Sequence, residues 1–182
     1  MKEDVNMQNH NVETSKLGEP ISHSQRVEAS KEEVWREITK PGNLTDFHPF
    51  CQSNPVEIWP GKGSRDKIYY YSGLVLVREF INWIEGDGYD LIAGSEEGMR
   101  FKVSWRITDE EHGKSCLTLS IRPYIMGNSE KRMRQFSRLL GKYLNQVSKG
   151  FEYYMRTGKP IARNQFGSHR WFSPPVPQEA NT

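Results

Sequence analysis

The sequence has few of the features that would assign a function directly. It has only two cysteines, Cys51 and Cys116, which lie far apart and form neither a disulfide framework nor a CxxC motif. No apolar run reaches the length needed to span a bilayer, and residues 1–18 lack the apolar segment of a signal peptide. We therefore expect a cytoplasmic protein with free thiols.

Motifs for metals, phosphates and nucleophilic catalysis are also missing. The five histidines show no metal-ligand spacing, and the sequence contains no glycine-rich phosphate loop and no GxSxG motif. His48 and Cys51 are three residues apart, but a small buried thiol is the simpler interpretation of this pair. We expect no metal and no cofactor, and whether the protein is an enzyme stays open.

The net charge is also low, at +2 for 182 residues, so the charge gives no strong indication of nucleic-acid binding. The exception is the stretch from residue 128 to residue 160, where eight Lys and Arg residues accompany two acidic residues. A solvated helix face is the ordinary interpretation of such a stretch. The alternative is a docking surface for an acidic partner, an anionic membrane or RNA.

What the sequence does contain is a long amphipathic stretch near its end. Residues 128–158 predict a helix of roughly 43 Å, with Asn128 as its N-cap and Gly158 followed by Pro160 as its stop signal. Lys and Arg side chains gather on the face opposite the apolar one. The apolar face consists of Phe136, Leu140, Tyr143, Leu144, Val147, Phe151 and Tyr154.

The preceding residues read as a series of strands with one interruption. A first strand over 20–27 is followed by a capping box at Ser30 and Glu33 and by two short helices, which end before Pro41 and Pro49. Short turns then join strands at 56–59, 67–71, 74–85, 89–93, 100–107 and 117–122. We predict an α+β domain over 19–160, in which a curved antiparallel sheet of about seven strands wraps around the long helix. Residues 1–18 are expected to be disordered.

The strand over 74–85 is apolar on both faces, so its outer face needs a cover. The C-terminal tail, residues 161–182, carries Phe166, Trp171 and Phe172, and we predict that its part over 161–175 packs on the domain. The alternative cover is a second copy of the chain, which would make the protein a homodimer.

This order of elements resembles the helix-grip fold of the START/Bet v 1-like (SRPBCC) superfamily, and specifically its polyketide cyclase/dehydrase-like branch. The resemblance rests on residues 27–35 (VEASKEEVW), residues 41–49 (PGNLTDFHP), the turn over 63–65, and the strands that carry Glu79 and Trp105. It extends over residues 20–158. Proteins of this superfamily include lipid carriers, hormone receptors and cyclases, so the resemblance predicts the fold and leaves the activity open.

The resemblance implies a cavity between sheet and helix that takes a hydrophobic or aromatic small molecule. Tyr69, Tyr71 and Tyr143 could donate hydrogen bonds to a ligand carbonyl, or could pack at the rim. Large aromatics such as Trp35 and Trp83 are more often core residues than ligand contacts. The residues expected around the ligand are Trp35, Phe47, Tyr69, Tyr71, Trp83, Phe101, Val103, Trp105, Leu119, Phe136, Leu140, Tyr143 and Val147.

Two polar residues are weak candidates for catalysis. If Glu79 points inward, burial would raise its pKa and make it an acid or base, whereas an ion pair with a neighbouring strand is the alternative. His48 could act at the cavity mouth as an acid, a base or a gate, or could lie on the surface.

Three functions are compatible with these features. The first is a non-enzymatic binder of a hydrophobic or aromatic molecule, lipid-like or polyketide-like. The second is an aromatase/cyclase-type or dehydratase-like enzyme, in which proximity supplies much of the rate. The third is a lipid- or quinone-binding or ribosome-associated interaction module, because residues 47–51 distantly resemble that branch of the superfamily.

Overall fold

A computed structural model describes residues 17–98, 100–123 and 130–176, and the side chains of all of these except 130–133. Most of the predicted disordered segment and the predicted N-cap Asn128 lie outside this part of the chain. Gly18, which was assigned to the disordered segment, donates its backbone N–H to the Pro123 carbonyl at 2.8 Å, so this end of the segment is attached.

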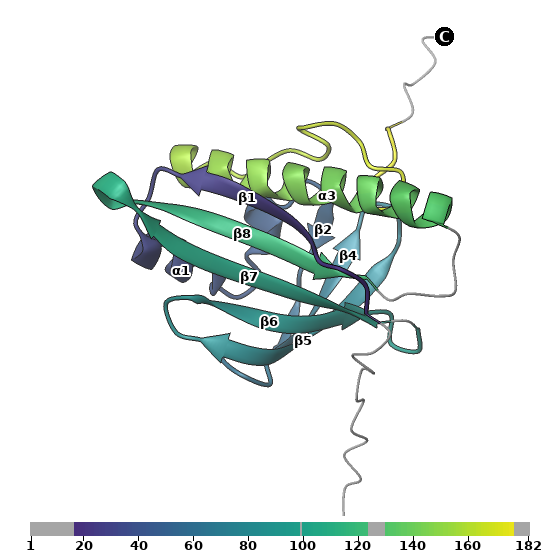
Figure 1. Ribbon diagram of the computed structural model, residues 1–182, viewed down its shortest axis with the longest axis horizontal. Helices are drawn as coiled ribbons and strands as arrows, with labels where there is room; N and C mark the ends of the chain where they lie inside the picture. Colours follow the sequence, from purple (N-terminus) through teal and green to yellow (C-terminus); the bar gives the residue numbers. More distant parts are fainter. Residues whose placement is uncertain (1–16, 99, 124–129, 177–182) are drawn as a thin grey trace, which may run out of the picture.

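An antiparallel sheet with the strand order β1-β8-β7-β6-β5-β4-β2 curves around the long helix α3 (Figure 1). Strand β3 also pairs with β4. The predicted fold class is therefore confirmed, with one additional short strand, β2. The elements are β1 (Ile21–Val27), α1 (Lys31–Ile38), α2 (Leu44–Phe47), β2 (Cys51–Ser53), β3 (Val56–Ile58), β4 (Arg65–Tyr70), β5 (Val75–Ile84), β6 (Gly88–Gly94), β7 (Arg100–Glu110), the 3-10 helix η2 (Glu111–Gly113), β8 (Lys114–Arg122) and α3 (Glu130–Thr157).

The two short helices are held by local polar contacts. Ser30 and Glu33 form the predicted capping box at the start of α1. At its end, the Asn43 side-chain amide donates to the carbonyls of Glu37 and Ile38, at 2.9 and 2.8 Å. These bonds satisfy terminal carbonyls that have no partner within the helix, and they turn the chain sharply into α2.

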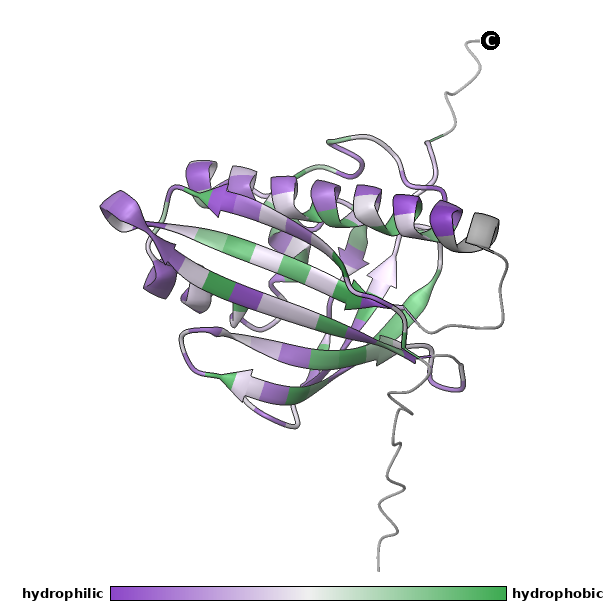
Figure 2. Ribbon diagram, in the orientation of Figure 1, coloured by the Kyte–Doolittle hydropathy of each residue, from purple (hydrophilic) through white to green (hydrophobic). Residues whose placement is uncertain are grey.

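Helix α3 places its apolar face on the sheet and its hydrophilic face outward (Figure 2). Leu144, Val147 and Phe151 are buried on this inner face. Gly150 allows α2 to approach closely, because a Cβ atom at this position would lie 2.0 Å from the Phe47 carbonyl oxygen. The helix ends as predicted at Gly158, whose φ of +65° is the left-handed conformation that glycine adopts readily.

A β-bulge in β5 alters which side chains face inward. The register changes between Phe80, which lies opposite Leu91, and Asn82, which lies opposite Asp90. The extra residue lets Phe80 and Trp83 share the inner face, with ring centroids 5.8 Å apart. Strict alternation over the predicted strand 74–85 places Trp83 and Phe80 on opposite faces, and this expectation is wrong because of the bulge.

The C-terminal segment, defined here as residues 158–176, runs back along α3 in the opposite direction (Figure 1). Gln146 donates to the carbonyls of Phe166 and Gly167, and Lys142 donates to that of Ser168. The segment thus packs against α3 and does not lie over the outer face of β5, where Ile81 is 43% exposed. That face instead carries Glu79, which pairs with Arg65 of β4 and Arg100 of β7.

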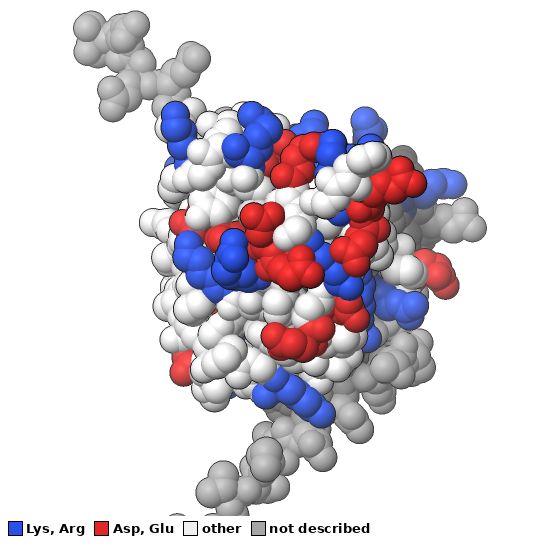
Figure 3. Space-filling model, turned by 90° about the vertical axis from the view of Figure 1, so that its left-hand side faces the viewer, with Lys and Arg blue, Asp and Glu red and all other residues white. Residues whose placement is uncertain are grey.

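Acidic and basic side chains alternate at the end of the molecule formed by α1 and η2 (Figure 3). Ion pairs here join Lys31 to Asp87 and Lys114 to Glu28. This end therefore has no large surface of a single charge. Among the helices that the structure describes, none combines the length and apolar character needed to cross a membrane. The cytoplasmic location remains a prediction.

Candidate ligand-binding site

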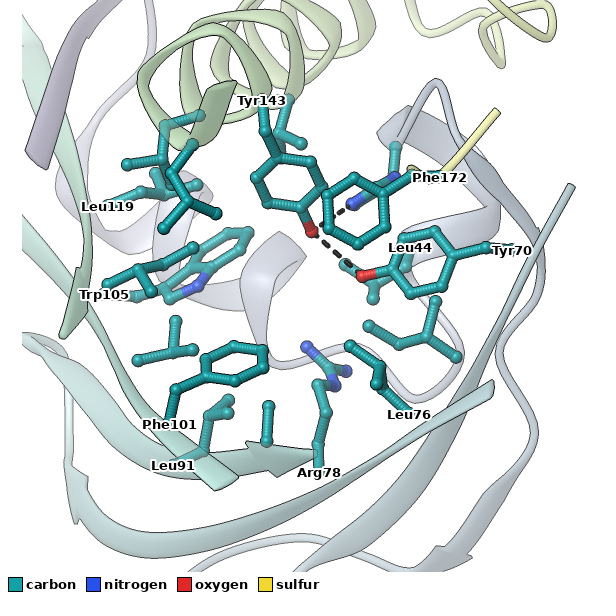
Figure 4. A pocket seen from close by; sticks show the side chains of 18 residues that line it. Leu44, Tyr70, Leu76, Arg78, Leu91, Phe101, Trp105, Leu119, Tyr143 and Phe172 are labelled. Atoms are coloured by element: carbon teal, nitrogen blue, oxygen red, sulfur yellow. Dashed lines mark hydrogen bonds between the residues drawn. The ribbon is translucent and has the colours of Figure 1, made fainter. Parts of the chain in front are cut away.

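A cavity lies between the inner face of the sheet and α3 (Figure 4). The volume of this cavity is about 50 Å³. Helix α2 and the C-terminal segment contribute to its walls together with β4–β8 and α3. The lining residues are Leu44, His48, Ile68, Tyr70, Leu76, Arg78, Leu91, Ala93, Phe101, Val103, Trp105, Leu119, Ile121, Leu140, Tyr143, Leu144, Val147 and Phe172.

Most of this wall follows from strand alternation and helix periodicity. On β7, Phe101, Val103 and Trp105 point inward at every second position, and β8 contributes Leu119 and Ile121 in the same way. The wall is therefore predominantly apolar, and the few polar groups on it stand out.

A chain of hydrogen bonds joins three of these polar groups (Figure 4). His48 Nε2 lies 2.8 Å from the Tyr143 hydroxyl, which lies 3.0 Å from the Tyr70 hydroxyl. The backbone N–H of Phe50 donates to His48 Nδ1 at 3.2 Å, so Nδ1 is an acceptor and Nε2 carries the proton.

The three side chains carry one more hydrogen-bonding proton than the bonds between them use. His48 donates to Tyr143, and a single proton suffices for the bond between Tyr143 and Tyr70. Two phenols bring two protons, so one hydroxyl hydrogen is left for a further acceptor. Since both residues line the cavity, an acceptor oxygen of a ligand or a water molecule there could receive it.

The pKa values of these groups keep them neutral. Burial, reinforced by the positive charge of Arg78, lowers the pKa of His48 to about 3. Burial also raises the pKa of Tyr143 to about 12 and moves that of Tyr70 in the same direction. At neutral pH the chain therefore offers hydrogen bonds without carrying charge.

Arg78 is the one cationic group among the described residues that line the cavity, and Figure 4 shows its guanidinium directed toward the cavity. It lies opposite Asp66 in the sheet and forms a two-point ion pair with it, in which Nε donates to Oδ1 at 2.7 Å. The two side chains are 5% and 1% exposed. Although burial works against its charge, the attraction of Asp66 raises the pKa of Arg78, so the cavity contains a permanent positive charge.

The structure brings together seven of the thirteen residues expected around the ligand, and His48 with them. These seven are Phe101, Val103, Trp105, Leu119, Leu140, Tyr143 and Val147. That they bind a ligand remains a prediction.

Three of the polar candidates do not reach the cavity. Tyr69 and Tyr71 point away from the cavity, because the residues of β4 that face inward are Ile68 and Tyr70. Tyr69 is 38% exposed, and Arg163 covers the ring of Tyr71 at 4.7 Å. Glu79 lies on the outer face, 2.7 Å from Arg100 of β7, so the structure supports the alternative given for it, an ion pair between strands.

The other four expected residues belong to the packing around the cavity and do not line it. Phe47 fills the core between Trp105 and Phe151, at ring distances of 6.1 and 4.9 Å. Trp35 and Trp83 contact each other outside the cavity lining, at 5.4 Å. Phe136 packs on Trp171 of the C-terminal segment, at 5.3 Å.

Several residues of the candidate site were missed from the sequence. Arg78 lies in a predicted strand and Asp66 directly precedes the neighbouring one, so their opposite charges were a signal that they could pair. The inward position of Tyr70 depends on the register of β4, which the sequence pattern does not show. Phe172 lies outside every predicted strand and helix, so no periodic pattern could place it in the cavity.

Metal and thiol chemistry find no support in the described residues. No group of three His, Cys, Asp or Glu side chains there could hold a metal ion. Burial raises the pKa of Cys51 to about 12, and its Sγ faces the Ser53 carbonyl rather than His48. The simpler interpretation, a small buried thiol, therefore fits.

A cavity between a curved antiparallel sheet and a C-terminal helix defines a helix-grip protein, and comparison with solved structures agrees. A START superfamily protein from Mycobacterium smegmatis matches with a TM-score of 0.64 and 13% identity, over 78% of this chain and 100% of that one. CalU16 from Micromonospora echinospora matches with a TM-score of 0.56 and 14% identity, over 76% and 77%.

DynU16, a protein of the dynemicin biosynthetic locus, matches with a TM-score of 0.58 and 17% identity, over 80% of this chain and 51% of that one. Ara h 8.0201 matches with a TM-score of 0.58 and 14% identity, over 76% and 98%. No protein-family model and no curated protein matches the sequence. The resemblance to the START/Bet v 1-like superfamily is thereby confirmed at the level of the fold.

Proposed function

We propose that this protein binds a hydrophobic small molecule that carries an aromatic or other apolar body and one oxygen acceptor. The observation that carries this proposal is the pairing of an apolar cavity with a preorganised donor wall, formed by the chain of His48, Tyr143 and Tyr70 together with Arg78. Ligand pockets of this type are mostly apolar, with a few polar groups that fix the orientation of the ligand.

The energetics favour such an acceptor over a purely apolar ligand. A buried donor that loses its partner costs about 1–3 kcal/mol. A hydrocarbon that displaced water from the spare hydroxyl hydrogen would incur this cost. A carbonyl, phenolate or carboxylate oxygen would instead accept the hydrogen bond and interact favourably with the charge of Arg78.

The test compares two tyrosines of α3, with anilinonaphthalene sulfonate as the probe because it combines aromatic rings with an anionic oxygen group. Tyr143→Phe removes the hydroxyl from the cavity wall, and we expect it to weaken binding by about 1 kcal/mol, or roughly fivefold. Tyr153→Phe removes a hydroxyl of the same helix outside the cavity and should leave the affinity unchanged. Fluorescence titration measures both. If the wild type shows no saturable binding, or if both variants bind alike, the donor wall has no such role.

A second candidate is an aromatase/cyclase-type enzyme, which the convergence of Tyr70, Tyr143, His48 and Arg78 on one wall favours. Donors of this kind can stabilise the oxygen of an enolate during ring closure. Incubation with a flexible poly-β-ketone separates the candidates, because an enzyme would yield an aromatic product with new near-ultraviolet absorbance and a binder would return the chain unchanged.

The third alternative, an interaction module that uses the basic face of α3, has less support. Lys142 donates to the Ser168 carbonyl at 3.0 Å, and Arg156 pairs with Glu152 at 2.9 Å. These side chains already have partners within the chain, as expected for a solvated helix face.

A further inference from the structure

Phe172 is the one cavity-lining residue that the C-terminal segment contributes among the described residues. Its ring lies at 4.7 Å from that of Tyr70, 4.6 Å from that of Tyr143 and 5.0 Å from that of His169. Figure 4 shows it beside the two phenolic hydroxyls. The ring thus fills space next to the hydrogen-bond donors, where the oxygen-bearing part of a ligand would lie.

The size of the cavity gives this position its significance. The space that remains, about 50 Å³, is too small for an aromatic ring system. A larger ligand requires that part of the wall move. The strands cannot move without breaking the ladder that joins them, and α3 is anchored on the sheet by its buried face.

The C-terminal segment is attached in a different way. Around Phe172 it is a turn closed on itself, in which His169 and Ser173 exchange two backbone hydrogen bonds at 2.9 and 2.8 Å. This turn is joined to the body by hydrogen bonds and by the buried side chains of His169 and Ser173. Lys142 donates to the Ser168 carbonyl, the Ser72 N–H donates to the Phe172 carbonyl at 3.0 Å, and His169 Nε2 donates to the Leu139 carbonyl at 3.1 Å. None of these bonds pairs two strands or closes a turn of α3, so the turn is the part of the wall whose departure leaves the sheet and the helix intact.

We propose that Phe172 occupies an aromatic subsite of the ligand site, and that a ligand with an aromatic ring binds by displacing it. This inference rests on the proposed binding function and specifies the ligand class further. The ring of the ligand takes the place of Phe172 against Tyr70 and Tyr143. An oxygen on or beside that ring then meets the spare hydroxyl hydrogen and the charge of Arg78.

Phe172→Ala tests the displacement, with Phe166→Ala as the matched control. Phe166 belongs to the same segment but packs on Tyr153, at 6.4 Å, and does not line the cavity. With anilinonaphthalene sulfonate as the probe, we expect Phe172→Ala to bind about tenfold more tightly than the wild type, because no ring has to be displaced. Phe166→Ala should bind like the wild type. Thermal unfolding verifies that both variants are folded.

Hydrogen exchange of the wild type gives a second readout that does not depend on a variant. Saturating probe should expose the Ser72 amide, because its acceptor, the Phe172 carbonyl, leaves with the turn. The inference is overturned if the probe binds with the Ser72 amide still protected and Phe172→Ala gains no affinity over Phe166→Ala. That result would leave the proposed binding function standing. If instead folded Phe172→Ala and the wild type both fail to bind the probe, the binding function itself fails, and the inference fails with it.

Discussion

At the scale of single residues, Asp66 and Arg78 dominate the electrostatics of the cavity. Their ion pair is almost completely buried, and Arg78 influences the pKa of His48 and of Tyr143. Exchanging a buried pair for apolar residues can be neutral, but removing one partner leaves an uncompensated charge in the interior. The pair is neutral as a whole, and it holds the positively charged guanidinium of Arg78 on the cavity wall while Asp66 lies outside the lining.

We expect Asp66→Asn to lower the free energy of unfolding by about 3–5 kcal/mol, because Arg78 would lose its counter-charge while remaining buried. Glu152→Gln is the control, since it breaks the surface pair with Arg156 and should cost less than about 0.5 kcal/mol. Urea unfolding measures both variants. A loss for Asp66→Asn no greater than that of the control would show that the buried pair does not stabilise the fold.

At the scale of elements, the approach of α2 to α3 depends on the absence of a side chain at one position. Two glycines lie in the middle of α3, and their surroundings differ. A Cβ atom at Gly150 would meet the Phe47 carbonyl oxygen at 2.0 Å and Ile161 Cδ1 at 2.9 Å, whereas one at Gly141 would have nothing within 4 Å. Glycine at position 150 therefore permits close packing of α2, whereas glycine at position 141 only lowers the stability of the helix.

Gly150→Ala should lower the free energy of unfolding by about 1–3 kcal/mol, because backbone and side-chain atoms have to shift. Gly141→Ala, in the same helix, should raise it by about 0.5–1 kcal/mol, because alanine is the better helix former. Chemical unfolding of both variants gives the sign directly. Equal changes in the two variants would mean that α2 does not pack tightly on α3 at this point.

At the scale of the whole molecule, burial of histidines couples stability to pH. The pKa values of His23, His48 and His169 all lie below 6.5, with burial as the largest cause in each case. For His48 the folded value is about 3. Between pH 6.5 and pH 3, His48 binds a proton in the unfolded chain but not in the folded one. The stabilisation is therefore complete above pH 6.5 and is lost as the pH falls toward 3.

We expect the free energy of unfolding of the wild type to fall on acidification below pH 6 more steeply than that of His48→Asn, by about 1.4 kcal/mol per pH unit. The control is His112→Asn, which replaces an exposed histidine whose φ of 62° asparagine also adopts. Denaturant unfolding between pH 6 and 4 gives the slopes. A His48→Asn slope equal to that of the control would show that His48 is not held neutral in the folded protein.

The sequence alone determined the elements and their general arrangement. The capping box at Ser30, the stop at Gly158 and the alternation on the strand of Trp105 depend on contacts within a few residues, and these patterns correctly predicted the sheet around the C-terminal helix. The same periodicities predicted the cavity-facing positions of β7, β8 and α3, because a regular element repeats its exposure at fixed intervals.

Only the tertiary structure decided which other residues join Tyr143 and His48 at the site. The register of β4 selected Tyr70 over its neighbours, and the bulge in β5 placed Trp83 and Phe80 on one face. Phe172 reached the cavity through an irregular segment that returns along α3. Register, bulges and irregular segments are set by contacts between residues far apart in the chain, so local pattern carries little information about them.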